Sequence, residues 1–185
     1  TRPIQDMDAY RTELSSMVYK SGTLMQPIVV QAKQNPKRVI YAEGEELKVL
    51  RAVEEVIEDN LAIPIIVGRT DIVMGHIKNE GLALRIGENV EHIDPYNHPK
   101  YDEYAKTYLS LMQRRGLTPT TIHEVLSTSP TVTAALAVAI GDADAMICGV
   151  TGRYLNHLRH ITDIIGRRKD VAQLSAMSAL ILNKG

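Results

Sequence analysis

The feature that most constrains the fold is an alternation of short apolar runs with longer amphipathic segments. The runs 38–42 and 63–68 have strand length, and each precedes a segment, 45–60 or 70–80, whose apolar residues recur at helical spacing. Parallel strands need a long connection between them, which a helix supplies. The sequence therefore predicts an α/β protein with a mainly parallel sheet covered by helices on both faces, a three-layer α/β/α arrangement.

The rest of the chain continues this alternation. Glycine residues and Thr-Pro and Ser-Pro pairs divide it into segments of element length. Gly116 is expected to end the helix before it, since glycine readily adopts the left-handed conformation that closes helices. The elements expected after residue 80 are a strand over 90–93, helices over 99–115, from Thr118 and over 131–140, a strand over 145–148, and a helix reaching Gly166.

Two helices are predicted before the first strand. Apolar residues recur at helical spacing over 5–20, and a shorter helix is expected over 25–34. We expect residues 1–35 to form a helical connector from an upstream part, and residues 36–185 to form the N-terminal portion of the α/β domain.

Both ends of the chain are expected to be cuts within a longer polypeptide. The chain begins at Thr1 without Met, and it ends soon after the apolar run 176–182. Such a run is typical of an internal strand or helix whose packing partners lie further on. A second domain is therefore expected to be only partly present.

Composition narrows the function classes. The 185 residues carry a formal net charge of −1 and include no Trp or Phe, which disfavours both attraction to nucleic acid and an aromatic platform for base stacking. No apolar run approaches the roughly 20 residues of a membrane-spanning helix. Cys148 is the single cysteine, so no intrachain disulfide can form. We expect a cytoplasmic protein that binds neither nucleic acid nor membrane.

The strongest candidate for a binding site is the segment that leads from the strand over 145–148 into the next helix. In open parallel sheets ligands bind beyond the carboxyl ends of the strands, and a helix N-terminus favours anions. Thr151 could donate its hydroxyl, and Arg153 or Arg159 a guanidinium fork, to a phosphate or a carboxylate. The alternative is a basic helix face that is solvated or paired with acidic neighbours.

The junction between the first strand and its helix does not predict a dinucleotide site. Residues 42–46, Ala-Glu-Gly-Glu-Glu, place one glycine and three carboxylates where a pyrophosphate would have to lie. The carboxylates are expected at the positive end of the helix dipole instead, with Glu43 near the cap.

Three other sets of polar residues have a structural interpretation beside a functional one. His157 and His160 share a helix face at metal-ligand spacing, but no third ligand is evident, so no metal site is expected. Cys148 ends an apolar strand, which favours a buried small side chain over a nucleophile. Asp142 and Asp144 could be paired acid/base carboxylates, although their place in a turn favours turn-forming and capping roles.

Several stretches together resemble the phosphate acetyl- and butyryltransferase family. The similar segments are 39–45, 49–52, 64–69 and 141–149, in the order of that family. Residues 1–22 and 112–116 are similar to the version that is fused behind a bacterial NADP-dependent malic enzyme. The resemblance implies a phosphotransacetylase or isocitrate-dehydrogenase-like fold.

The resemblance also implies functional residues. Thr151 and Arg159 match positions that the transferases use near coenzyme A and phosphate, whereas residues 152–154, which include Arg153, depart from the small hydroxyl residues expected there. A second active-site arginine of the family falls at Met112, and a thioether cannot replace a guanidinium. The family's catalytic serine and aspartate lie beyond Gly185, so no catalytic residue is expected in this segment.

The resemblance predicts a regulatory and oligomerisation domain that binds acetyl-CoA or a related acyl-CoA. No cofactor is expected in this segment, while NADP and a divalent metal belong to the absent upstream part that oxidatively decarboxylates malate to pyruvate. A homo-oligomer, a dimer or higher, is also implied. Two alternatives stay open at this point: an active phosphate acetyltransferase, and a dimerisation module without a ligand.

Overall fold

The computed structural model describes residues 6, 10, 22–112, 116 and 118–175. Two compact units make up the chain, one from residues 1–35 with 170–185 and the other from residues 36–169. Among the described residues, no helix combines the length and the hydropathy that crossing a bilayer requires.

The first unit contains helix α2, Gly22–Gln34, with Pro27 in its interior. This helix confirms the one expected over 25–34 and begins three residues earlier. The expected helix over 5–20 lies outside the described residues, apart from residues 6 and 10, and so does the apolar run 176–182.

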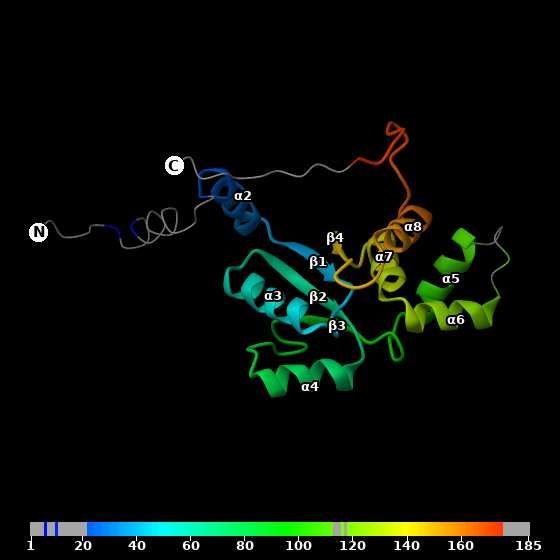
Figure 1. Cartoon of the computed structure of the whole chain (residues 1–185), viewed down its shortest axis with the longest axis horizontal. Coiled ribbons are helices and arrows are strands. Elements are labelled where there is room, and N and C mark those ends of the chain that lie inside the picture. The colour runs from blue at the N-terminus through cyan, green and yellow to red at the C-terminus, as the bar shows by residue number, and fades with distance from the viewer. Residues whose placement is uncertain (1–5, 7–9, 11–21, 113–115, 117, 176–185) are drawn as a thin grey trace, which may run out of the picture. The chain divides into compact units, whose positions relative to one another are not determined.

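The second unit is built on a single parallel sheet, as predicted. Its strand order is β3-β2-β1-β4, and each pair of neighbours is parallel (Figure 1). Ile40 in the central strand β1 lies beside Ile65 on one side and Met146 on the other. The strand bounds are β1 Lys37–Tyr41, β2 Ala62–Val67, β3 Glu91–Ile93 and β4 Ala145–Ile147.

Helices cover both faces of this sheet and make the three predicted layers (Figure 1). Successive residues of a strand point to opposite faces, so Ile40 belongs to one core cluster and Tyr41 to the other. The cluster of Tyr41 packs against α3, Leu47–Glu58, and α4, Thr70–Glu80. The cluster of Ile40 packs against α5 Tyr101–Met112, α6 Pro119–Thr128, α7 Pro130–Ile140 and α8 Tyr154–Ile164.

Helix α7 is the most deeply buried helix of the second unit. Every residue from Thr131 to Ala137 is buried. Its alanines are small enough for close approach to the sheet, and the buried Thr133 hydroxyl donates a hydrogen bond to the Leu126 carbonyl at 3.1 Å. A buried hydroxyl without such a partner would lower stability. The prediction of a buried helix over 131–140 is confirmed.

Local signals fix the ends of several elements. The Thr118 side chain accepts a hydrogen bond from the Thr121 backbone N–H at 3.2 Å and caps α6. Gly81 and Gly141 close α4 and α7 with φ of 65° and 86°, the left-handed region that glycine adopts at little cost. Gly116 has φ of 72°, but residues 113–115 are outside the described part, so its role as the end of α5 stays a prediction.

Candidate functional site

A crevice of about 420 Å³ lies where the strands of the sheet end at their carboxyl side. Each strand leads into a loop that contributes to the wall, and the first turns of α3, α4 and α7 adjoin it. In open parallel sheets this edge is where ligands bind. The residues that line the crevice are Ala42, Glu43, Glu45, Glu46, Val67, Gly68, Arg69, Pro95, Tyr96, Ser127, Thr128, Pro130 and Thr151.

The strand order reverses between β1 and β4. From β1 the chain adds β2 and β3 on one side and then returns to add β4 on the other. Glu43 lies just past the end of β1 with only 7% of its surface exposed, and its Oε1 accepts a hydrogen bond from the Gly149 backbone N–H at 2.7 Å. This contact holds the start of the loop between β4 and α8, residues 148–153, against the end of β1.

The other end of the β4–α8 loop is held by His157. Its Nε2 lies 2.7 Å from the Thr151 carbonyl oxygen, and its Nδ1 lies 2.8 Å from the Thr131 hydroxyl at the start of α7. A carbonyl oxygen can only accept, so Nε2 carries the proton and donates a hydrogen bond to the Thr151 carbonyl. In the neutral ring, Nδ1 then accepts a hydrogen bond from Thr131.

The opposite wall of the crevice is stabilised by a bidentate ion pair. Arg69 donates from Nε to Glu45 Oε1 and from a terminal nitrogen to Oε2, both at 2.9 Å, and its backbone N–H donates to the same carboxylate. The hydrogen bonds from Arg69 hold the pKa of Glu45 below its usual range, although burial acts against them. The only guanidinium in the crevice wall, among the described residues, is therefore occupied by a carboxylate.

Asp94 orders the loop after β3. It accepts hydrogen bonds from the Thr70 hydroxyl at 2.6 Å and from the Tyr96 backbone N–H at 2.9 Å. Burial alone would raise the pKa of Asp94, but these hydrogen bonds outweigh it and the pKa is lowered. The loop that carries Tyr96 to the crevice is thus tied to the start of α4.

The structure brings one of the three predicted site residues to the crevice. Thr151 lines it, and its hydroxyl has no hydrogen-bond partner among the described residues. Arg153 and Arg159 are exposed and are not among the lining residues. Arg159 has 77% of its side chain exposed and lies 3.9 Å from Asp163, which is the long, solvated ion pair expected of a basic helix face.

The expectation for Met112 needs correction. Its side chain is only 4% exposed and belongs to the hydrophobic cluster under α5, and it does not line the crevice. A thioether packs well in such a place. The identity of residue 112 is therefore explained by core packing, and it does not report on a lost phosphate contact.

The remaining candidates have structural roles. His157 uses both ring nitrogens within the protein, and in the described part of the chain no group of three potential ligands could hold a metal ion. Burial and the nearby charge of Glu43 raise the pKa of the Cys148 thiol, which disfavours the reactive thiolate. Asp144 accepts a hydrogen bond from the Arg38 backbone N–H at 2.8 Å and aligns β4 with β1.

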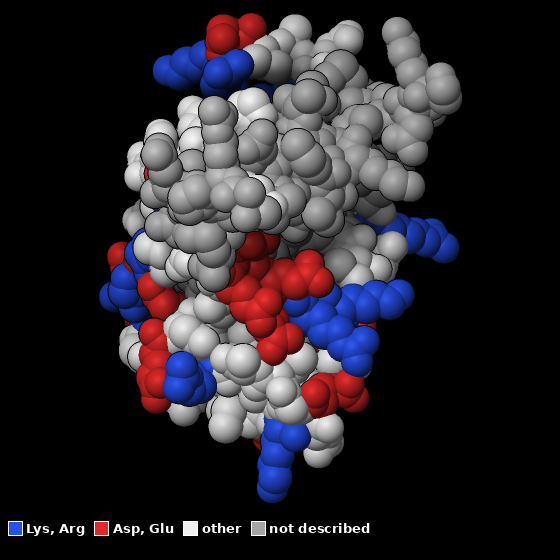
Figure 2. Space-filling view, turned by 90° about the vertical axis from the view of Figure 1, so that its left-hand side faces the viewer, with Lys and Arg blue, Asp and Glu red and all other residues white. Residues whose placement is uncertain are grey.

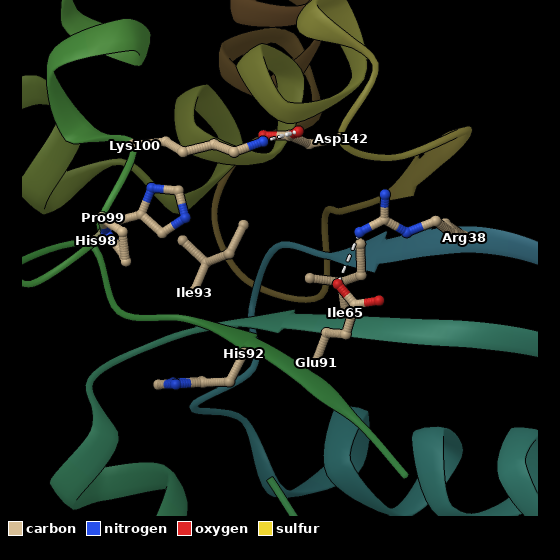
Figure 3. Close-up of a pocket in the computed structure, with 9 residues that line it drawn as sticks. All are labelled: Arg38, Ile65, Glu91, His92, Ile93, His98, Pro99, Lys100 and Asp142. Carbon is tan, nitrogen blue, oxygen red and sulfur yellow. Dashed lines mark hydrogen bonds and ion pairs between the residues drawn. The ribbon is translucent and has the colours of Figure 1, made fainter. Parts of the chain in front are cut away.

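A second, smaller cavity of about 210 Å³ lies on the sheet face that α5 and α7 cover. In Figure 3, Lys100 extends across its roof toward Asp142, and Arg38 turns toward Glu91. Asp142 also accepts a hydrogen bond from the Tyr104 hydroxyl at 3.0 Å. Its carboxylate therefore joins the start of α5 to the turn before β4, in keeping with the structural interpretation of the sequence.

One polar atom of this second cavity has no partner. Nδ1 of His98 is buried without a hydrogen bond to any described residue, and the ring packs on Tyr104 at 4.9 Å between centroids. Burial lowers the pKa of His98, against the opposing charge of Asp142. Since both cations of the cavity already pair with carboxylates, the cavity has no net charge to attract an ion, and it is large enough for ordered water.

The surface carries both signs of charge. On the face shown in Figure 2, acidic side chains gather near the centre, and a group of basic side chains lies directly beside them. This arrangement agrees with the formal net charge of −1.

Sequence reasoning missed the two side chains that hold the β4–α8 loop. The sequence predicts Glu43 near the cap of α3, but the N-cap is Glu46. Glu43 instead accepts a hydrogen bond from Gly149, 106 positions away. The spacing of His157 and His160 suggests metal ligands, whereas the structure pairs His157 with Thr131, 26 positions away. Local sequence patterns do not predict contacts between residues so far apart in the chain. The one available signal was the placement of a carboxylate directly after a buried strand.

Comparison with known proteins gives one consistent result. Residues 23–185 match the family model described as phosphate acetyl/butaryl transferase. Over its whole length the chain is 44% identical to an NAD-dependent malic enzyme of Rhizobium meliloti and 43% identical to an NADP-dependent malic enzyme of Haemophilus influenzae. It covers 24% of each, so it spans about a quarter of these relatives.

The fold has a counterpart among solved structures. A phosphotransacetylase from Streptococcus pyogenes superimposes with a TM-score of 0.70 over 80% of this chain and 45% of its own, at 18% sequence identity. At that identity the likeness shows the fold alone, and it agrees with the predicted phosphotransacetylase-like architecture.

Proposed function

The chain belongs to the phosphate acetyl/butaryl transferase family, and on this premise we propose that it is the regulatory domain of a malic enzyme. In this proposal it binds acetyl-CoA, or a related acyl-CoA, and thereby lowers the rate of malate oxidation by the rest of the polypeptide. The observation that carries the proposal is similarity along the entire chain, at 43–44% identity, to proteins that are named malic enzymes and are about four times as long.

The crevice suits the uncharged part of an acyl-CoA. Glu43 and Glu46 make its lining unfavourable for phosphate, because the one cation among the described lining residues, Arg69, is already paired with Glu45. The pantetheine arm and the thioester are neutral and meet no such repulsion. Thr151 offers a hydroxyl to this arm at the point where the β4–α8 loop borders the crevice.

The anionic end of the ligand would lie outside the crevice. Arg153 begins α8 as its N-cap residue and has no side-chain partner among the described residues, and Arg159 lies less than two turns along the same helix. Guanidinium groups bind phosphates in a bidentate way. We infer that these two side chains hold the phosphates of the nucleotide at the mouth of the site.

The described residues favour binding over group transfer. Of the serine and threonine hydroxyls that line the crevice, those of Ser127 and Thr128 donate to backbone carbonyls of their own helix, and that of Thr151 has no base within hydrogen-bond reach among the described residues. A hydroxyl without an adjacent base is a weak nucleophile. This part of the chain therefore supplies contacts to a ligand without activating an attacking group.

Malate oxidation by the full polypeptide tests the proposal. We expect saturating acetyl-CoA to lower the rate, which requires tighter binding to the less active conformation. Arg159→Ala should weaken this response without changing the rate in the absence of acetyl-CoA. An unchanged rate at saturating ligand would reject regulation, and formation of acetyl phosphate from acetyl-CoA and phosphate would favour an active transferase instead.

We propose that malate oxidation itself takes place in an upstream part of the polypeptide. NADP and a divalent metal are proposed to act there, although the malic enzymes similar to this chain are named for either NAD or NADP. The homo-oligomer stays a prediction, and sedimentation of the full polypeptide would test it.

A further inference from the structure

We propose that His157 is the positioning residue of the β4–α8 loop, and that with Glu43 it holds Thr151 ready for the ligand. The role in ligand binding rests on the proposed function, whereas the order of the loop does not. His157 is not among the residues that line the crevice, and it acts through the backbone of Thr151.

His157 joins three parts of the fold through one ring. It projects from the first turn of α8, reaches the Thr151 carbonyl with Nε2 at 2.7 Å, and reaches the Thr131 hydroxyl with Nδ1 at 2.8 Å. Thr131 is 3% exposed and belongs to the buried helix α7. The loop is therefore tied to the most deeply buried helix of the second unit.

The backbone of the loop passes close to the His157 ring at Gly152. Gly152 has φ of 90°, and a Cβ on it would lie 3.0 Å from Nε2 of His157. A larger residue at 152 would strain the backbone, and its Cβ would press on the imidazole, which would have to shift by a few tenths of an ångström. The positive φ and the closeness of the ring both favour glycine at this position.

Glu43 secures the loop at its first residue. The Gly149 N–H donates to its buried carboxylate at 2.7 Å, and Gly149 has φ of 103°. The loop is held at Gly149 from β1 and at Thr151 from α8, two residues apart. Between two fixed points this close, the backbone has little freedom, so binding a ligand there costs little further ordering.

The tautomer of His157 in the wild-type 185-residue chain tests the geometry directly. Nitrogen-15 shifts of the ring should show a proton on Nε2 at a pH where the ring is neutral. A neutral ring with its proton on Nδ1 would overturn the proposal, because Nε2 could then not donate to the Thr151 carbonyl.

Backbone relaxation tests the consequence for the loop. In the wild type we expect order parameters of about 0.85 for Gly149, Thr151 and Gly152, and values below about 0.6 in His157→Ala. His160→Ala, three residues along the same helix, is the matched control and should leave the loop ordered. Should His157→Ala fail to fold, Gly152→Ala provides the second variant and should loosen the same loop. A loop that stays ordered in the folded variant would contradict the positioning role.

Calorimetry of the full polypeptide with acetyl-CoA separates this proposal from the proposed function. If the wild type binds, His157→Ala should bind about tenfold more weakly, because the loop must then be ordered on binding. Unchanged affinity in a folded His157→Ala variant would refute the role of the residue in binding. Absence of binding to the wild type would refute the proposed function instead, while the tautomer and the relaxation data still decide the loop.

Discussion

Gly44 allows the backbone after β1 to pass close to the backbone at the end of β2. A Cβ on Gly44 would lie 2.7 Å from the Val67 carbonyl oxygen and 3.0 Å from Cβ of Ile66. The Gly44 N–H also donates to that carbonyl at 2.9 Å, which brings the crevice ends of β1 and β2 together. A side chain there would have to push backbone away from backbone.

Gly44→Ala should therefore destabilise the protein. We expect a loss of about 1–3 kcal/mol in the free energy of unfolding, the usual range for overpacking. Gly75→Ala is the matched control, since Gly75 lies inside α4 and a Cβ there would meet nothing within 4 Å. That change should be neutral or stabilise by up to about 1 kcal/mol, because alanine favours the helix. Urea unfolding measures both, and equal effects would contradict the packing argument.

The lowered pKa of His98 gives stability a pH dependence. Burial favours the neutral ring in the folded protein, so the unfolded chain binds a proton more readily. Stability is then present above the unfolded pKa, near 6.5, and falls as the pH drops from there through the lower folded pKa. His160, whose pKa burial also lowers, adds to the same slope.

His98→Gln should reduce this slope. Urea unfolding at several values between pH 7 and pH 5 would compare the variant with the wild type, and the double variant His98→Gln/His160→Gln should be flatter still. Slopes that do not change in either variant would show that the two rings titrate alike in the folded and the unfolded chain.

At the residue scale, residue type and local context predicted some structural roles, but not which distant residues a side chain contacts. Asp144 has the structural role that the sequence favoured, and Cys148, expected to be buried, is partly buried against the hydrophobic core. The sequence did not anticipate that Met112 packs in the core or that His157 serves the β4–α8 loop. Such assignments depend on contacts between distant segments, which residue type and spacing do not determine.

At the scale of elements, helix α6 shows how a local signal fixes a boundary. Thr118 caps it, and Pro119 occupies the first helical turn, where its missing N–H costs nothing. The helix starts where the sequence predicted. Its C-terminal end leads directly into α7 through Ser129, so the start of α6 orders the approach to the most buried helix.

Thr118→Ala should destabilise the protein by about 1 kcal/mol, because the Thr121 N–H loses its acceptor. Thr120→Ala is the matched control: Thr120 is exposed in the same first turn and caps nothing. It should be neutral or slightly stabilising. Thermal unfolding of the two variants distinguishes the lost cap from a general effect of replacing a surface threonine.

The elements were largely predictable because hydrophobic periodicity is local. The strands and helices described in the second unit were expected, and the ends that can be compared differ from the expected ones by at most two residues. The expected strand over 145–148 stops at Ile147, since Gly149 adopts the left-handed conformation and its N–H bonds Glu43. The start of α3 moves from residue 45 to Leu47, because Glu46 has extended backbone angles and is the N-cap. At the end of β4 a tertiary contact overrode the local pattern.

At the scale of the whole molecule, the parallel order β3-β2-β1-β4 creates the site. It brings the ends of β1 and β4 together at the reversal of strand order, although they are about a hundred residues apart in the sequence. Alternation of strand and helix predicts a parallel sheet, but it does not give the order of the strands. The crevice could therefore be expected at the carboxyl edge, while its lining could not be named in full.

Chemical-shift mapping of the chain with acetyl-CoA tests the central claim most directly. We predict that the amide signals of Gly149, Thr151, Gly152 and Arg153 shift on titration, with smaller changes at Glu43 and Tyr96 across the crevice. Signals around His98 in the second cavity should stay in place. Shifts confined to that cavity, or no shifts at saturating acetyl-CoA, would contradict the account.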